Sequence, residues 1–121
     1  MSDQPISTGQ EGGTSAEEEL DLRAGFPFLP VGTVVMLKEG ERPVMIAGVM
    51  EQDGSTGRLW DYMGYPYPEG RQDATKDHFF DRDMIASVLQ FGFTDMQAVG
   101  FQVYLSGALG EYERLRKAQD A

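Results

Sequence analysis

The sequence contains no cysteine and only one histidine, His78, among its 121 residues. Without cysteine there is no disulfide framework and no thiolate nucleophile, which suits a reducing compartment. No apolar run approaches the roughly 20 residues needed to span a bilayer, and no basic region followed by an apolar one marks a signal peptide. These absences predict a cytoplasmic protein.

Basic residues are also scarce, since ten Lys and Arg stand against twenty Asp and Glu and give a net charge of -10. Residues 1–25 hold six of the acids and one arginine, whereas residues 26–121 hold fourteen acids and nine bases. The sequence has no basic patch of the kind that nucleic-acid binding requires. We therefore expect neither nucleic acid nor membrane as a partner, and an acidic surface that favours basic proteins.

Large aliphatic residues are nearly missing from residues 1–25, where Ser, Gly, Gln, Thr and Glu dominate. Such a segment cannot bury enough surface to offset its ordering entropy. We expect a disordered acidic tail over residues 1–25 and one domain over residues 26–121, a length that fits a single core.

Three apolar segments separated by turn residues predict an antiparallel meander. These segments are Thr33–Lys38, Val44–Met50 and Arg58–Gly64. His78–Phe80 fits a short edge strand, and Asp81 fits a cap for a following turn. Residues 84–91 are compatible with helix or strand; we favour a fourth strand, because Gly92 bounds the segment and Val88 favours β structure.

A helix is expected from Thr94 to near the C-terminus, with Gln97 completing a capping box. Its predicted inward stripe consists of Ala98, Phe101, Tyr104, Leu105, Ala108, Leu109, Tyr112 and Leu115. Met96, Val99 and Val103 fall on the opposite side and either pack inside the domain or meet a partner. Gly107 and Gly110 leave open whether the helix is continuous. The fold class is therefore α+β, with three or four antiparallel strands packed against a C-terminal helix.

The most unusual stretch is Trp60–Gly70, which we call the elbow; it contains the only tryptophan, three of the five tyrosines and two of the six prolines. Pro66 and Pro68 lack an amide hydrogen, so we expect the third strand to stop before them. The aromatic residues either roof a small core or form a recognition surface, since Tyr and Trp are favoured in hot spots. The candidate partner-binding residues are Trp60, Tyr62, Tyr65, Tyr67, Glu69, Met96, Val99 and Val103.

The sequence shows no catalytic or cofactor motif. His78 lies near three aspartates, but their spacing matches no compact metal-ligand motif. No serine lies in a nucleophile elbow, and no second carboxylate pairs with Asp61 at strand spacing for acid–base work. We therefore predict no enzyme activity, no metal and no cofactor.

Four segments resemble a family of short proteins of Gram-positive bacteria that is catalogued only as a domain of unknown function. They are Leu29–Lys38, Pro43–Gly48, the elbow and Phe79–Ile85, and the resemblance covers about residues 28–93. Members are similar in lying near type VII secretion clusters and their polymorphic toxins. The resemblance supplies no catalytic residues.

The resemblance implies a non-enzymatic interaction protein, an accessory factor or chaperone for a type VII secretion substrate with a basic or helical contact surface. An immunity protein that neutralises a toxin is the first alternative. A small hydrolase that uses Asp61 and His78 is the second. The sequence identifies neither the partner nor the oligomeric state.

Overall fold

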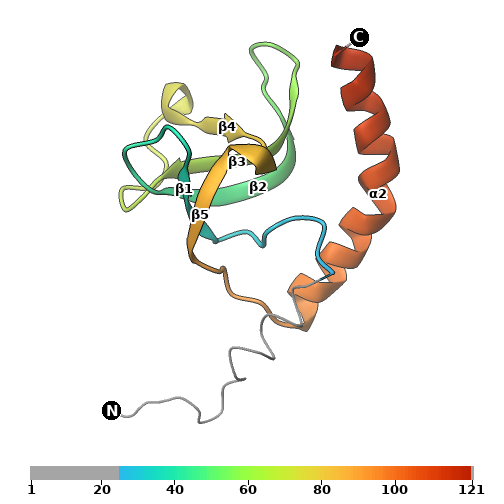
Figure 1. The fold of residues 1–121 in the computed structure, drawn as a ribbon, viewed down its shortest axis with the longest axis horizontal. Helices are drawn as coiled ribbons and strands as arrows, with labels where there is room; N and C mark the ends of the chain where they lie inside the picture. The colour runs from blue at the N-terminus through green and yellow to red at the C-terminus, as the bar shows by residue number, and fades with distance from the viewer. Residues whose placement is uncertain (1–24, 121) are drawn as a thin grey trace.

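A computed structural model describes residues 25–120, and all but the last residue of the predicted tail lies outside this range. Five strands, two short 3-10 helices and one long helix make up the described chain (Figure 1). They are β1 (Val34–Leu37), β2 (Val44–Gln52), β3 (Leu59–Pro66), η1 (Ala74–Lys76), β4 (His78–Phe80), η2 (Arg82–Met84), β5 (Ile85–Gln90) and α2 (Met96–Asp120). The predicted α+β class is confirmed.

The strands form one antiparallel sheet in the order β4-β3-β2-β1-β5. β4 and β5 lie at opposite edges, yet only residues 81–84 join them. A connection coiled as a 3-10 turn rises about 2 Å per residue and reaches about 10 Å, whereas four strand spacings in a flat sheet take about 19 Å. The sheet must therefore curl until its edges approach, and Figure 1 shows this strong curvature, with α2 alongside.

The two short segments after the elbow, predicted from the sequence as an edge strand and as either helix or strand, are both strands. His78–Phe80 pairs with β3 as an edge strand, and Ile85–Gln90 returns to pair with β1. The preference for strand over helix in residues 84–91 is confirmed, and the sheet has five strands because both short segments join it.

β3 does not stop before the prolines of the elbow, so this expectation is wrong. Tyr65 pairs with Met45, and Pro66 pairs with Val44. The missing amide of Pro66 is tolerated at the end of the ladder, because the next amide, that of Tyr67, donates to the Pro43 carbonyl at 3.0 Å. The chain then turns, and the Gly70 amide donates to the Pro66 carbonyl at 2.7 Å.

The core lies between the curled sheet, the lead-in segment before β1 and α2. Its buried residues are Phe28, Val35, Val44, Ile46, Tyr62, Phe80, Leu105 and Tyr112. Phe28 is central, since its ring lies edge-on to Tyr62 at 5.8 Å and to Tyr112 at 6.1 Å. The Tyr62 hydroxyl accepts a hydrogen bond from the Leu29 amide at 2.8 Å. The lead-in segment thereby joins helix to sheet.

α2 begins at Met96, two residues later than expected, and its cap is Asp95 instead of Thr94. Asp95 Oδ1 accepts a hydrogen bond from the Ala98 amide at 2.9 Å, as an N-cap carboxylate does. The Thr94 hydroxyl donates instead to the Gly92 carbonyl at 3.1 Å. From this cap the helix runs unbroken to Asp120, through Gly107 and Gly110.

The inward side of α2 differs from the predicted stripe. Only Gln102, Leu105 and Tyr112 are buried among its 25 residues. Phe101, Tyr104 and Leu115 were expected inside, but all three are exposed. The helix is rotated so that Arg116, which shares a side with Tyr112, reaches the buried carboxylate of Asp61 on β3 and the half-buried carboxylate of Asp81 before η2.

No helix within residues 25–120 has the length and apolarity that crossing a membrane requires.

Candidate functional site

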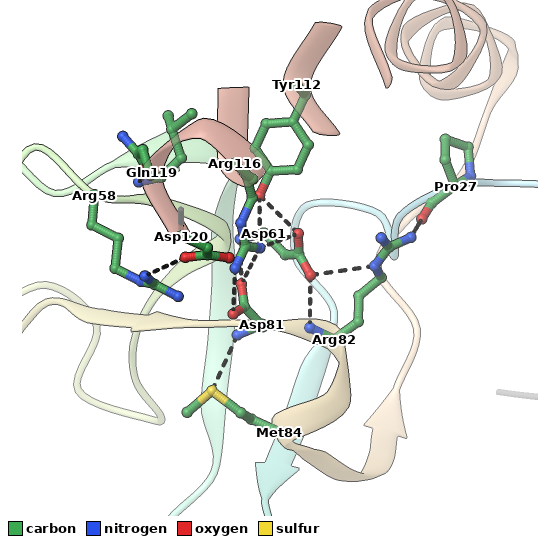
Figure 2. A network of polar contacts seen from close by, with 11 residues as sticks. Pro27, Arg58, Asp61, Asp81, Arg82, Met84, Tyr112, Arg116, Gln119 and Asp120 are labelled. Carbon is green, nitrogen blue, oxygen red and sulfur yellow. Dashed lines mark hydrogen bonds and ion pairs between the residues drawn. The ribbon is translucent and has the colours of Figure 1, made fainter. Parts of the chain in front are cut away.

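The most connected polar group in the described chain surrounds Asp61, a β3 residue that is only 5% exposed (Figure 2). Asp61 Oδ1 accepts hydrogen bonds from the Tyr112 hydroxyl at 2.7 Å and from Arg116 Nη1 at 3.1 Å. Asp61 Oδ2 accepts from the backbone amide of Arg82 at 2.9 Å and from its Nε at 3.3 Å. Both carboxylate oxygens are thus fully engaged.

Asp81 is the second carboxylate of this group. It occupies the N-cap position of η2, as expected. Its carboxylate also accepts hydrogen bonds from both terminal nitrogens of Arg116, at 2.7 and 2.9 Å, and from the backbone amide of Asp61 at 3.0 Å. We call Asp61, Asp81, Arg82, Tyr112 and Arg116 the Asp61 cluster.

The pKa values of the cluster follow from these contacts. Burial raises the pKa of Asp81, but hydrogen bonds from Arg116 and from the Asp61 amide outweigh it, so that pKa lies below its ordinary value. Burial, together with the hydrogen bond to Asp61, raises the pKa of the Tyr112 hydroxyl. The hydrogen bond to Asp81 raises the pKa of Arg116. The Asp81 carboxylate therefore stays ionised and the Tyr112 hydroxyl stays neutral near pH 7.

Such a cluster joins β3, η2 and the C-terminal half of α2. Arg82 extends it to the lead-in segment, since Arg82 Nη1 donates to the Pro27 carbonyl at 2.8 Å and its guanidinium lies 4.8 Å from the centroid of the Phe28 ring. Sequence reasoning missed these partners, although Tyr112 and Arg116 are four residues apart and therefore share a helix face. The arrangement positions the helix.

The histidine of the hydrolase hypothesis lies elsewhere. His78 is an exposed β4 residue paired with Gly64. His78 lines a surface groove, and Asp61 is not among the residues that line the same groove. The structure therefore does not bring these two residues together at one opening. Within residues 25–120 no group of three or more potential metal ligands occurs.

The groove has a volume of about 860 Å³ and lies between the β1–β2 turn, the elbow, η1 and η2. Apolar atoms come from Leu37, Pro43, Val44, Pro66 and Met84, and charged side chains from Lys38, Glu39, Glu41, Arg42, Lys76 and Asp83. Volumes of a few hundred to a thousand Å³ are typical of sites that bind small ligands or short segments.

Arg42 holds the elbow against the groove wall. Its guanidinium donates to the Tyr67 carbonyl at 3.1 Å and forms an ion pair with Glu69. The hydrogen bond from Arg42 lowers the pKa of Glu69. Gly64, within β3, has no room for a side chain, because a Cβ there would lie 2.6 Å from the Met45 carbonyl oxygen.

The candidate contact residues of the elbow divide into two groups. Tyr62 is fully buried, and its expected role at an interface is therefore wrong. Trp60 and Tyr65 are half-buried, and Arg58 lies 4.6 Å from the centroid of the Trp60 ring. Tyr67 (47% exposed) and Glu69 reach solvent. The structure thus places Tyr62 in the core and Tyr67 at the surface, where contact with a partner stays a prediction.

The helix residues also divide. Met96 and Val103 are 77% and 67% exposed, whereas Val99 is half-buried. We define the outer side of α2 as Met96, Gly100, Val103, Tyr104 and Gly107, all exposed. Figure 1 shows α2 on one side of the sheet, and the β1–β2 turn with the turn that follows β3 on the other. The predicted residues therefore form two separate surfaces.

A model of one protein family matches residues 28–101, which is more than half of the chain. The chain belongs to the family described as Domain of unknown function (DUF4176). The match includes the whole sheet, the elbow, the groove, Asp61 and Asp81, but it ends before Tyr112 and Arg116. Neither a curated protein nor a solved structure matches the chain.

Proposed function

We propose that this DUF4176 protein is a non-enzymatic interaction protein that holds a segment of a partner in the groove beside the elbow. We propose further that it serves a type VII secretion substrate as an accessory factor or chaperone in the cytoplasm. The observation that supports binding here is the groove itself, which is lined by both apolar and charged residues and lies beside the exposed Tyr67.

The charge of the molecule favours a basic partner. Each arginine in the described chain forms an ion pair with an acidic residue of the same chain. The acidic residues that outnumber the basic ones, and give the net charge of -10, therefore remain available to solvent and to a basic partner. Long-range attraction of this kind mainly raises the rate and specificity of association.

Tyr67→Ala tests the proposal, with the product of the neighbouring gene as the partner. We expect the substitution to weaken binding by about 2 kcal/mol, the range of an interface hot spot, measured by titration calorimetry. The thermal midpoint should change little, because the Tyr67 side chain is exposed. Tyr104→Ala is the matched control, since Tyr104 is an exposed tyrosine on the opposite surface, and it should leave this affinity unchanged.

Fragments of the partner then separate the two roles. Binding to a helical targeting part marks a chaperone, whereas binding to the toxic part marks an immunity protein. If the Tyr67→Ala variant and the parent protein bind the partner with equal affinity, the partner does not bind at the groove.

A further inference from the structure

One stretch of α2 differs from the rest of the chain in charge. Residues 96–110 include no Asp, Glu, Lys or Arg, in a protein of which 25% of residues are charged. An uncharged stretch of about 15 residues would be ordinary in a buried helix, but only Gln102 and Leu105 are buried within it. Depletion of charge is typical of the core of an interface.

Large apolar side chains are exposed along this stretch. Met96, Val103 and Tyr104 are each at least two-thirds exposed, and Phe93, just before the helix, is 82% exposed. Methionine and aromatic residues, such as Met96, Tyr104 and Phe93, are enriched in interfaces. An exposed apolar patch on this scale marks an interaction site.

Two glycines in the same region have no explanation within the chain. Gly100 and Gly107 are seven residues apart, so they lie two turns apart on one side of α2. A Cβ atom at either position would meet nothing within 4 Å, although each glycine costs about 1 kcal/mol in a helix. A flat surface at these positions lets another backbone approach closely.

The outer side of α2 is self-complementary. The uncharged stretch is centred on residue 103, and Gly100 and Gly107 are centred between Val103 and Tyr104. A two-fold axis at this point, perpendicular to two antiparallel copies of α2, places Gly100 of one copy opposite Gly107 of the other. An isologous contact of this kind matches the commonest symmetry of protein oligomers.

Charge selects the antiparallel arrangement over the parallel one. Arg114 lies seven residues beyond Gly107, on the same side of the helix. In a parallel pair it would face its own copy, placing two cations together. In the antiparallel pair the two copies of Arg114 lie about 30 Å apart along the helix axis. The helix dipoles are also opposed in this arrangement.

We propose that the outer side of α2 binds a second copy of this chain, as an antiparallel two-fold pair of helices with the axis beside Val103. The uncharged contact keeps the acidic groups of the two molecules apart, and at physiological salt charges beyond about 8 Å are largely screened. The β1–β2 turn, which lines the groove, lies on the other side of the sheet (Figure 1). Each copy therefore keeps its groove open, and the proposal does not depend on the proposed function.

The absence of cysteine provides a direct test on the full chain. Val103→Cys introduces the only thiol next to the proposed axis, within the roughly 6 Å between Cα atoms that a disulfide requires. Ala118→Cys is the matched control, because position 118 is also an exposed α2 residue. In the antiparallel pair the two copies of residue 118 lie about 40 Å apart.

We expect Val103→Cys to form a disulfide-linked dimer under mild oxidation and Ala118→Cys to remain monomeric. The parent protein should sediment as a dimer at concentrations above about 10 µM, the affinity typical of a small interface. Val103→Glu should abolish that dimer while the circular dichroism spectrum stays unchanged.

Each other outcome would overturn the proposal. Cross-linking of both cysteine variants would indicate a parallel pair. A parent protein that stays monomeric to about 100 µM would leave the helix surface to a different protein. If the Val103→Glu variant still forms the dimer, the dimer interface does not lie on the outer side of α2.

Discussion

At the scale of single residues, the Asp61 cluster is the contact set on which the position of α2 depends most. Within residues 25–120, Arg116 is the only cationic side chain that contacts both the buried Asp61 and the half-buried Asp81, with its two terminal nitrogens on Asp81 and one on Asp61 (Figure 2). A protein with such an ion-pair group is about as stable as one in which apolar residues replace the whole group. Removing one member alone is destabilising, because it leaves a buried charge without its partner.

Arg116→Met should therefore lower the free energy of unfolding by about 3–5 kcal/mol, measured by urea denaturation. Arg114→Met is the matched control on the same helix, since Arg114 pairs with Glu111 and both side chains are more than 60% exposed. Exposed pairs contribute about 0–1 kcal/mol. Similar losses in the two variants would show that the buried carboxylates do not need Arg116.

The pH dependence of stability should follow Asp81. Its folded pKa lies below the ordinary value, because hydrogen bonds from Arg116 and the Asp61 amide outweigh burial. The stabilisation is fully present above the unfolded pKa of about 3.9. It is lost as the pH falls through the lower folded pKa, where the native carboxylate takes up its proton.

Asp81→Asn should accordingly lower stability at pH 7 and flatten its acid dependence between about pH 5 and pH 2. Urea unfolding of parent and variant across this range measures the difference. An unchanged slope in the variant would assign the acid sensitivity to other carboxylates.

At the scale of elements, the same residue type has opposite roles in the sheet and in the helix. Gly64 is required in β3, where a Cβ would lie 2.6 Å from both Val44 Cγ1 and the Met45 carbonyl oxygen. Gly110 in α2 has open space around it. Glycine is a necessity at the first site and a cost to helix stability at the second.

Gly110→Ala should raise the free energy of unfolding by about 0.5–1 kcal/mol, whereas Gly64→Ala should lower it by about 1–3 kcal/mol through overpacking against backbone. Thermal unfolding at low protein concentration, where the chain is monomeric, compares the two. Stabilisation by Gly64→Ala would mean that β2 and β3 separate readily at the elbow.

At the scale of the whole molecule, α2 and the β1–β2 turn, which lines the groove, lie on opposite sides of one curled sheet (Figure 1). Residues in separate places with no shared partner behave independently. Val103→Glu should therefore leave affinity for the partner, titrated per chain, within about twofold, and Tyr67→Ala should leave the sedimentation profile unchanged. Loss of both properties in either variant would show that pairing and partner binding are coupled.

The sequence by itself determined the α+β class, the three central strands and the presence of a C-terminal helix. These features depend on local properties, namely apolar periodicity and turn residues, that neighbours in sequence supply. It also indicated Tyr67, Met96 and Val103 as candidate contacts, which the structure places at the surface.

Tertiary structure alone decided the rest. Asp61 and Asp81 are twenty residues apart, and they meet Arg116 only because η2 folds over β3 and α2 packs beside both. The same contacts rotate α2, which turns Tyr104 outward and Gln102 inward, against the apolar periodicity of the helix. A helix with apolar residues on several sides has no preferred face of its own, so the partner that satisfies its buried polar groups selects the face.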